Sequence, residues 1–313
     1  MENIRIYRVI AGILAVGMAV GILFADNISD SIEDGLYRDH IIYMEQTQYQ
    51  KIVMTKHRDD VRLYIDGNCQ FSTADEYRYH EALVHVPMSE LSKREDVLIL
   101  GGGDGMAVRE VLKYDEVKDI TLVDLDAEMI RICSTNPNIT EINGNSLQSE
   151  KLHVINTDAY EYLEKSEDMF DLIIVDLPDP NSESLNKLYS NIFYRMCGNH
   201  LKDDGVMVVQ STSPYYATKA FWCINHTIES EGFYVKPYHL QVPAFGDWGF
   251  NMASRKELKE ELTFDVETKY LSAENVSALF LFGKDEMAED VEINRLTRPV
   301  LMEYYNKAVE KWD

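Results

Sequence analysis

The sequence is poor in cysteine and in basic residues. Its 313 residues include four cysteines, and 30 lysines and arginines stand against 54 acidic residues, leaving a formal net charge of −24. Cysteines this far apart, with no CxxC pair, favour neither a zinc site nor a dense disulfide framework, and they suit a reducing compartment. The negative charge repels nucleic-acid backbones, which excludes nucleic acid as a partner. It is compatible with cationic substrates, although a solvated acidic surface explains most of it.

Long apolar runs are also scarce, and the longest lies near the start. Residues 9–25 are apolar and uncharged, at the short limit for a membrane-spanning helix. A secretory signal is one alternative, but Leu23-Phe24-Ala25 is a poor cleavage site for it. A buried helix is another, which apolarity on all sides disfavours. We therefore expect residues 1–28 to contain a membrane-spanning helix.

Residues 29–92 are expected to form a small N-terminal β unit and a linking helix. Short stretches rich in β-forming residues are separated by turn residues, which predicts an antiparallel arrangement. The predicted strands cover 49–55, 61–65 and 69–72. A helix is predicted over 76–86, with Pro87 after it.

Residues 93–254 alternate between apolar strand runs and helical stretches. Strands are predicted at 97–100, 120–123, 152–155, 172–175 and 206–209, and helices near 105–114, 126–135, 158–165, 187–201 and 214–231. This alternation indicates an α/β domain with a Rossmann-like, doubly wound parallel sheet covered on both faces. Two more strands, near 233–242 and 248–253, would close one edge. Residues 255–313 are predicted to be a charged, helical C-terminal extension.

A glycine-rich loop follows the first strand of this domain. The loop 101–105 reads GGGDG, which lets the backbone turn sharply and a ligand approach closely. Met106 stands where the dinucleotide fingerprint has its last glycine. A pyrophosphate binds a helix N-terminus because amides and the helix dipole attract anions, and the carboxylate of Asp104 opposes that. The loop therefore favours a cationic ligand over a phosphate.

Two further acids follow the next two strands. Asp124 ends the second strand, where a carboxylate suits ribose hydroxyls, and Asp158 follows the third, where an acceptor can bind an adenine amino group. With the glycine loop they indicate a nucleoside pocket without a phosphate site, as in proteins that use S-adenosylmethionine. The alternative for each acid is helix N-capping, which for Asp158 alone is nearly as good an explanation.

The fourth strand ends in two aspartates that are fixed by prolines. Asp176 and Asp179 stand in the run DLPDP, at the edge of the sheet where α/β proteins bind ligands. A polyamine needs carboxylate partners for its ammonium groups, and one amine must lose a proton before it can attack carbon. An aspartate within hydrogen-bond reach can be that base. The alternative is a turn with two solvated aspartates.

Together these motifs resemble the spermidine synthases, the polyamine aminopropyltransferases. The segments RYHE at 78–81, GGGDG at 101–105, VDLD at 123–126 and DLPDP at 176–180 stand in the order and spacing of that family. The resemblance extends from about Tyr49 to Ser254. Segments 215–223 and 242–250 resemble the subgroup whose synthase domain follows transmembrane helices.

The resemblance implies a set of donor-binding residues. Gln50 and Gln70 would contact the methylthioadenosine part of the donor, beside Gly101 and Gly103 of the loop. Asp124 would bind the ribose, Asp158 with Ala159 the adenine, and Asp104 the aminopropyl ammonium. Asp124 replaces the usual glutamate of soluble members, which shortens the reach to the ribose.

The same resemblance implies the catalytic and acceptor-binding residues. Asp176 would be the proton acceptor, helped by Tyr79. The acceptor amine would be bound by His80, Asp179 and Phe245, together with Asp104 and Asp176. Phe245 stands where many members have a tyrosine, and after Pro180 the run Asn-Ser-Glu replaces a Gly-Pro element.

The expected reaction moves an aminopropyl group from decarboxylated S-adenosylmethionine to putrescine or a related diamine, giving spermidine and methylthioadenosine. The donor is a co-substrate, no cofactor is implied, and the histidines show no metal-ligand spacing. One alternative is an S-adenosylmethionine-dependent methyltransferase, which needs a cation for the donor carboxylate; after Asp104 the first is Arg109. The other is a non-catalytic polyamine-binding membrane protein. A homodimer is suggested by the family alone.

Membrane orientation is the point on which two arguments disagree. Arg5 and Arg8 precede the apolar run, which favours a cytoplasmic N-terminus and an external catalytic domain. The donor, however, is a cytosolic metabolite, and unpaired cysteines suit a reducing compartment. We expect the protein at the cell membrane with its catalytic domain on the cytoplasmic face.

Overall fold

The computed structural model describes residue 37 and residues 39–312. The predicted membrane helix at 1–28 lies outside these residues. Among the helices that are described, none combines the length and apolarity needed to cross a membrane. The chain divides into a small unit, which includes Gln50–Gln70, and a large unit made of Thr47–Tyr49 and the residues from Phe71 on.

The small unit is built on a four-stranded sheet in the order β1-β2-β3-β4. Its strands are β1 (His40–Gln46), β2 (Lys51–His57), β3 (Asp60–Ile65) and β4 (Asn68–Ser72). β1 pairs with β2, and β2 with β3, in antiparallel fashion, which confirms the predicted antiparallel unit. β1 was not among the predicted strands, because its residues alternate only weakly between exposed and half-buried positions.

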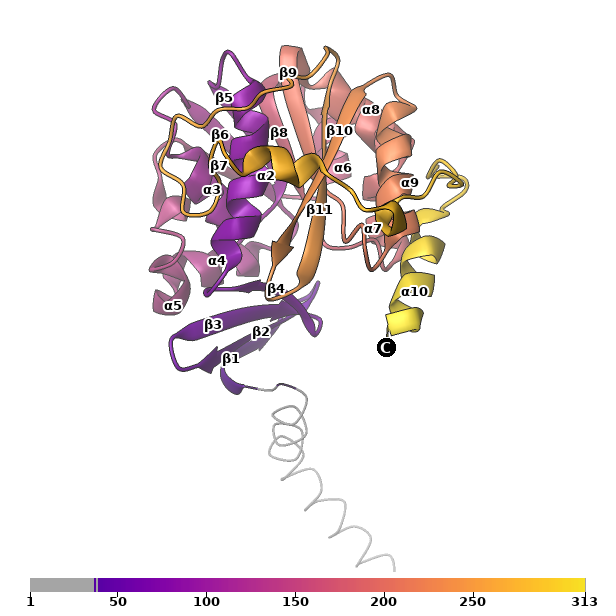
Figure 1. The fold of residues 1–313 in the computed structure, drawn as a ribbon. Coiled ribbons are helices and arrows are strands. Elements are labelled where there is room, and N and C mark those ends of the chain that lie inside the picture. Colours follow the sequence, from indigo (N-terminus) through magenta and orange to yellow (C-terminus); the bar gives the residue numbers. More distant parts are fainter. Residues whose placement is uncertain (1–36, 38, 313) are drawn as a thin grey trace, which may run out of the picture. The chain divides into compact units, whose positions relative to one another are not determined.

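The large unit contains a seven-stranded sheet in the order β10-β11-β9-β8-β5-β6-β7 (Figure 1). The strands are β5 (Asp96–Gly101), β6 (Asp119–Asp124), β7 (Leu152–Asn156), β8 (Phe170–Asp176), β9 (Leu201–Gln210), β10 (Tyr234–Val242) and β11 (Gly246–Ser254). β5 to β9 are parallel, and the β10–β11 hairpin joins β9 in antiparallel fashion. The chain reverses its direction across the sheet between β5 and β8, which makes this pair the topological switch point.

Helices cover both faces of this sheet. They are α2 (Glu76–Glu90), α3 (Met106–Val111), α4 (Ala127–Thr135), α5 (Pro137–Thr140), α6 (Ala159–Lys165), α7 (Glu183–Asn186), α8 (Asn191–Asn199), α9 (Thr218–Glu229) and α10 (Leu301–Trp312). Val97 and Ile99 of β5 enter a core with α2 and α3, and Leu98 enters a second core with α6, α8 and α9. Alternate residues of a strand point to opposite faces, so a continuous apolar run is what two cores require. The predicted Rossmann-like fold is confirmed.

Helix α2 runs past the predicted end at Val86 and includes Pro87. A proline removes one backbone hydrogen bond, which usually ends a helix. Here the next turn still buries Met88, and the amide of Leu91 closes the helix on the carbonyl of Met88 at 3.2 Å. The burial of one more apolar turn outweighs the missing bond.

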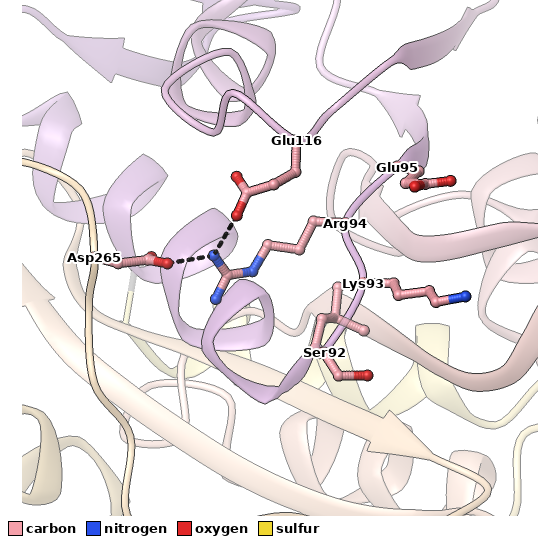
Figure 2. Close-up of a pocket in the computed structure, with 7 residues that line it drawn as sticks. Ser92, Lys93, Arg94, Glu95, Glu116 and Asp265 are labelled. Carbon is pink, nitrogen blue, oxygen red and sulfur yellow. Dashed lines mark hydrogen bonds and ion pairs between the residues drawn. The ribbon is translucent and has the colours of Figure 1, made fainter.

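Residues 255–300 contain two 3-10 turns, η3 (Val276–Phe280) and η4 (Lys284–Glu286), and no α-helix. The predicted helical extension over 255–313 therefore holds only for α10. A buried side chain of α2 holds this irregular segment: the Glu81 carboxylate accepts hydrogen bonds from the amides of Lys269, Tyr270 and Leu271. A pocket at the amino end of β5 shows a second anchor, where Arg94 pairs with Asp265 and Glu116 (Figure 2).

Candidate active site

The glycine loop and the first aspartate of the DLPDP run meet at the switch point. Gly101 ends β5 and is the register partner of Asp176, which ends β8. Gly101 has φ +84°, and a Cβ atom there would lie 2.1 Å from the carbonyl oxygen of Asp176. Only glycine permits this approach, because an added Cβ would collide with backbone that cannot give way.

Asp124 is bonded to the glycine loop through backbone amides. Its Oδ2 accepts from the amide of Gly103 at 3.1 Å, and its Oδ1 accepts from the amide of Asp126 at 2.9 Å. A Cβ atom on Gly103 would lie 2.5 Å from Asp124 Oδ2. Burial raises the pKa of Asp124 to about 6, and the charges of Asp126 and Asp104 act in the same direction. Asp124, the residue predicted to bind ribose, thus lies against the glycine-rich loop.

Asp104 is nearly buried within the loop. Its Oδ1 accepts from the amide of Met106 at 2.8 Å, and its carbonyl oxygen accepts from the Asn143 side chain at 2.9 Å. These two bonds fix the carboxylate at the start of α3, where its charge raises the pKa of Asp176. A fixed negative charge at this point suits the cationic ligand predicted from the loop.

Asp158 has the geometry of a helix N-cap, which was the alternative explanation for this residue. Its side chain caps α6, accepting from the amides of Tyr160 and Glu161 at 2.9 and 3.4 Å. The other oxygen forms an ion pair with Lys187 at 2.7 Å. Ala159, the first residue of α6, is buried beside it. The adenine-binding role of Asp158 and Ala159 stays a prediction.

Tyr79 and Asp176 form the predicted catalytic pair. The Tyr79 hydroxyl donates to Asp176 Oδ1 at 2.5 Å. Burial raises the pKa of Asp176 to about 6, and the charge of Asp104 adds to this, while His80 and the Tyr79 hydrogen bond act to lower it. Burial and the charge of Asp176 raise the pKa of Tyr79 well above its ordinary value, so the phenol remains a donor.

His80 is held by a buried ionic network that the sequence motifs did not indicate. Its Nδ1 donates to Glu76 Oε2 at 2.8 Å, and Arg109 binds the two Glu76 carboxylate oxygens with one NH group each, both at 2.9 Å. Burial by itself would raise the pKa of Glu76, but bonds from His80 and Arg109 lower it to about 2. Burial likewise opposes the charge on His80, yet Glu76, Asp104 and Asp176 together raise the His80 pKa.

Asp179 is contacted by residues that are far away in the sequence. Its Oδ2 accepts from the Tyr305 hydroxyl at 2.9 Å, and its Oδ1 accepts from Gln210 Nε2 at 3.4 Å. Burial raises the pKa of Asp179 to about 6, against the opposing effect of hydrogen bonds from Tyr305, Gln210 and Thr212. Gln210 is the last residue of β9, a position at the carboxyl edge of the sheet that could have indicated a role.

Phe245 belongs to an aromatic cluster around Tyr79. The Tyr79 ring lies 6.1 Å from Phe245, 6.5 Å from Trp248 and 5.2 Å from Phe250, centroid to centroid. This cluster comes from the β10–β11 hairpin and forms an apolar wall beside the Tyr79–Asp176 pair. Such a wall suits the methylene chain of a diamine.

Gln50 and Gln70 belong to the small unit. Gln50 precedes β2, and Gln70 lies in β4, where its amide donates to the carbonyl of Asn68 at 3.1 Å. The aspartates of the site all belong to the large unit. The donor-binding roles of the two glutamines therefore stay predictions.

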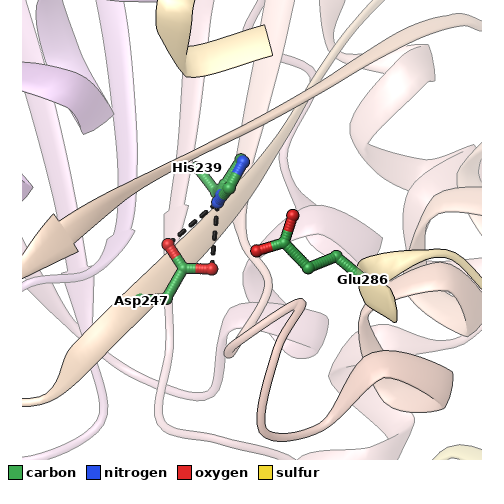
Figure 3. Close-up of side chains that lie close together, drawn as sticks. All are labelled: His239, Asp247 and Glu286. Carbon is green, nitrogen blue, oxygen red and sulfur yellow. Dashed lines mark hydrogen bonds and ion pairs between the residues drawn. The ribbon is translucent and has the colours of Figure 1, made fainter. Parts of the chain in front are cut away.

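Within residues 37 and 39–312, one trio of side chains has the composition of a metal site: His239, Asp247 and Glu286 (Figure 3). His239 Nδ1 lies 2.8 and 2.9 Å from the two Asp247 oxygens, and Nε2 lies 2.9 Å from the carbonyl of Leu281. Burial would lower the His239 pKa, but these bonds raise it. With an acceptor near each ring nitrogen, His239 ties the β10–β11 hairpin to the C-terminal extension.

Fold and site together define a Rossmann-like α/β protein with a cluster of carboxylates at its switch point. The chain belongs to the spermine/spermidine synthase family, since the family model for the spermine/spermidine synthase domain matches residues 76–265. The family resemblance seen in the sequence is confirmed. The likeness to the subgroup with transmembrane helices stays a prediction.

Known proteins of this family are similar to the chain over most of its length. It is 45% identical to the polyamine aminopropyltransferase of Oceanobacillus iheyensis over 317 residues, covering 100% of this chain and 62% of that protein. For the polyamine aminopropyltransferase of Leptospira interrogans the identity is 40%, over 98% of this chain and 61% of that one. The chain thus spans about three fifths of the length of these curated relatives.

Solved structures share the fold. A spermidine synthase crystallised with the transition-state analogue AdoDATO superposes with a TM-score of 0.73 at 28% identity, covering 79% of this chain and 88% of that one. Spermidine synthase from Thermotoga maritima gives a TM-score of 0.70, also at 28% identity, over 79% and 87% of the two chains.

Proposed function

We propose that the protein is an aminopropyltransferase that uses decarboxylated S-adenosylmethionine and putrescine or a related diamine. The observation that carries the proposal is the Tyr79–Asp176 pair at the switch point, a carboxylate with a pKa near 6 held by a 2.5 Å hydrogen bond. A carboxylate of that pKa is charged at neutral pH, and its pKa is near enough to neutral pH for it to accept a proton. Membership of the synthase family and the similarity to known polyamine aminopropyltransferases support this activity.

The reaction balances without any further reactant. The acceptor's neutral amine nitrogen forms a bond to the donor carbon next to the sulfonium, and the carbon–sulfur bond breaks. Its electron pair stays on sulfur, so methylthioadenosine leaves as a neutral molecule. The proton lost by the nitrogen passes to Asp176, directly or after transfer. Because the bond-forming step needs no covalent help, the enzyme contributes positioning and deprotonation.

The choice of a decarboxylated donor rests on Arg109. This guanidinium is the cation that a donor carboxylate near Asp104 would need, but it binds both oxygens of Glu76, the Glu110 carboxylate at 2.8 Å and the carbonyl of Ile142 at 2.8 Å. An unpaired carboxylate facing Asp104 would be repelled. A donor that ends in an ammonium group is attracted instead, which favours aminopropyl transfer over methyl transfer.

The proposal gives the residues of the large unit the roles that the family resemblance implies for them. Asp104, Asp124 and the loop glycines 101 and 103 bind the donor, with Asp158 and Ala159 at its nucleoside end. Asp176 accepts the proton with help from Tyr79. His80, Asp179 and Phe245 place the acceptor, whose ammonium charge is balanced by Asp104 and Asp179.

Purified protein given each donor with a panel of amines tests the proposal. Mass spectrometry should find methylthioadenosine and an aminopropylated amine from decarboxylated S-adenosylmethionine, and much less product from S-adenosylmethionine. S-adenosylhomocysteine formed with any acceptor would assign the protein to the methyltransferases. Binding of both ligands with no product from either would favour a non-catalytic polyamine-binding protein.

We further propose that residues 9–25 anchor the protein in the cell membrane, with the synthase domain on the cytoplasmic face, and that the protein forms a homodimer. The apolar run supports the anchor, and the cytosolic donor supports the orientation. Protease added to intact cells should leave the synthase domain uncut, and cleavage before lysis would place it outside. Sedimentation of the detergent-solubilised protein would report the dimer.

A further inference from the structure

The C-terminal helix α10 reaches the loop that follows β8. The Tyr305 hydroxyl donates to Asp179 Oδ2 at 2.9 Å, across 126 residues of sequence. The same carboxylate accepts from Gln210 Nε2 through Oδ1 at 3.4 Å. The short bond thus comes from Tyr305. Thr212 also donates to this carboxylate, which leaves one of its roughly four acceptor positions for another donor. Burial and the charge of Asp179 raise the pKa of Tyr305, so this phenol stays a donor.

Two buried asparagines fix α10 against the chain next to Asp179. Asn294 donates to the carbonyl oxygens of Asn186 and Tyr189 at 3.2 and 3.0 Å and accepts from the amide of Leu301 at 3.3 Å. Asn186 Oδ1 accepts from the amide of Met302 at 3.2 Å. Both side chains therefore bind the first turn of α10, whose own amides lack helical partners. Leu301 is fully buried below them.

The segment that receives α10 is bonded in turn to the DLPDP run. The Tyr189 hydroxyl donates to the carbonyl oxygens of Leu177 and Pro178, each at 3.1 Å, and accepts from Gln210 Nε2 at 2.8 Å. A continuous set of hydrogen bonds therefore joins the first turn of α10 to the backbone just before Asp179. These bonds fix the position of Tyr305 relative to Asp179, because α10 cannot shift without breaking them.

We propose that Tyr305 is a positioning residue of the acceptor site, which orients the Asp179 carboxylate to receive the far ammonium group of a diamine. This inference rests on the proposed function and adds to it a residue outside the matched synthase domain, which ends at 265. Tyr305 occupies Oδ2 and stops the carboxylate from rotating. The ammonium group then meets a preset oxygen at one distance from Asp176, so the bond also determines which diamine length fits.

The test compares Tyr305→Phe with Tyr304→Phe, the same change one residue earlier on α10. Tyr304 contacts Lys219 and the amide of Glu292, and no bond joins it to Asp179. Tyr305→Phe keeps the ring and removes only the hydroxyl. We expect it to raise KM for the diamine about tenfold, the scale of one hydrogen bond to a charged group, with kcat and donor affinity nearly unchanged. Tyr304→Phe should behave like the parent protein.

A monoamine acceptor separates positioning from general damage. A primary amine of the same chain length has no far ammonium group, so Tyr305→Phe and the parent should use it equally well. Equal loss with monoamine and diamine would overturn the inference, as would an unchanged diamine KM. Diamines with three to five methylene groups should be discriminated less sharply by the variant than by the parent.

Calorimetric titration of the diamine in the presence of methylthioadenosine tests the role of Tyr305 without relying on turnover. The parent should bind the diamine about tenfold more tightly than Tyr305→Phe does. If the parent binds in this way but forms no product, the proposed function fails while the role of Tyr305 stands. If the parent is active and both proteins bind equally, the role of Tyr305 fails alone. Absence of diamine binding by the parent overturns both.

Discussion

The hydroxyl of Tyr79 lies 2.5 Å from a carboxylate oxygen of Asp176, although 97 residues separate the two along the chain. Tyr79 comes from α2, before the large sheet begins, and Asp176 comes from the end of its fourth strand. The aromatic cluster around Tyr79 holds the ring, so the phenol can keep the carboxylate in one orientation. That orientation is what a proton acceptor needs, since its lone pair must face the attacking nitrogen.

Asp176→Asn should keep donor binding and lower turnover by about 10²-fold or more, because the amide cannot accept the amine's proton. Raising the pH should restore part of the activity, since more of the acceptor is then already neutral. Steady-state kinetics with decarboxylated S-adenosylmethionine measures both effects. Asp115→Asn, at an exposed turn position after α3, is the matched control and should leave turnover unchanged. Parent-like activity of Asp176→Asn would reduce Asp176 to a turn residue.

Glu76→Gln should unfold more easily and lower the pKa of His80. The substitution removes a carboxylate that His80 and Arg109 share in a buried network, a change that costs about 3 kcal/mol. Chemical denaturation measures the stability, and an NMR titration follows the His80 ring. Glu128→Gln breaks an exposed ion pair with Arg131 and should cost less than about 1 kcal/mol. Equal losses in the two variants would show that the network does not hold His80.

The free energy of unfolding of the ligand-free protein should fall between pH 5 and pH 7. Asp124, Asp176 and Asp179 each have a pKa raised to about 6, above the ~3.9 of an unfolded chain, so the folded state binds their protons more tightly. The stability they contribute is present at acid pH and is lost as the pH rises through 6. With partial exposure taken into account, we expect a loss of about 2 kcal/mol.

The raised pKa of His80 acts in the same direction. The lowered pKa of Glu76, about 2, acts only at more acid pH, where the protein should lose stability again. Denaturation curves at several pH values would show the fall, and Asp176→Asn combined with Asp179→Asn should flatten it. Stability that rises from pH 5 to pH 7 in the ligand-free protein would contradict this account.

Gly101→Ala should destabilise the protein by about 3 kcal/mol or more. The new Cβ would meet the carbonyl oxygen of Asp176 at 2.1 Å and would also strain a backbone with φ +84°. Gly67→Ala separates the two effects, because Gly67 has φ +82° but nothing within 4 Å of its Cβ position. That variant should cost about 1 kcal/mol, the strain alone. Thermal unfolding of both variants measures the two losses of stability. Similar losses would show that the close approach of Gly101 to Asp176 does not contribute.

Much of the fold could be predicted because most strands of the large sheet are short apolar runs between helical stretches. The Val-, Ile- and Leu-rich runs of β5 and β8 are buried on both faces, whereas the edge strand β7 is largely exposed. The observed strands extend the predicted ones by a few residues at most, except for β9. β9 begins at Leu201 in a stretch of charged residues that resembles a loop. The extension after Ser254 was misjudged for a related reason. Its charged residues suit a helix locally, but Glu81 and Arg94 bind it as an irregular chain.

The site could be predicted in part for the same reason. Asp104, Asp124, Asp158 and Asp176 each follow a strand of a parallel sheet, and the ends of such strands meet at one edge. The Glu76–His80 bond had a local signal in the sequence, because residues four apart on a helix lie side by side. The contacts of Arg109 with Glu76 and of Tyr305 with Asp179 had none. They join elements whose meeting depends on how whole helices pack.

The sequence by itself determined the doubly wound sheet, the glycine loop that approaches Asp176, and the acids along the carboxyl edge. These features follow from local pattern: strand runs define the sheet, and the strand ends define its edge. The tertiary structure alone decided which of these acids are paired and by what. In the folded protein Arg109 forms an ion pair with Glu76, Tyr79 donates a hydrogen bond to Asp176, and Tyr305 donates one to Asp179. Burial acts in the same way, because the pKa of a carboxylate depends on the whole packed surroundings and not on its neighbours in the chain.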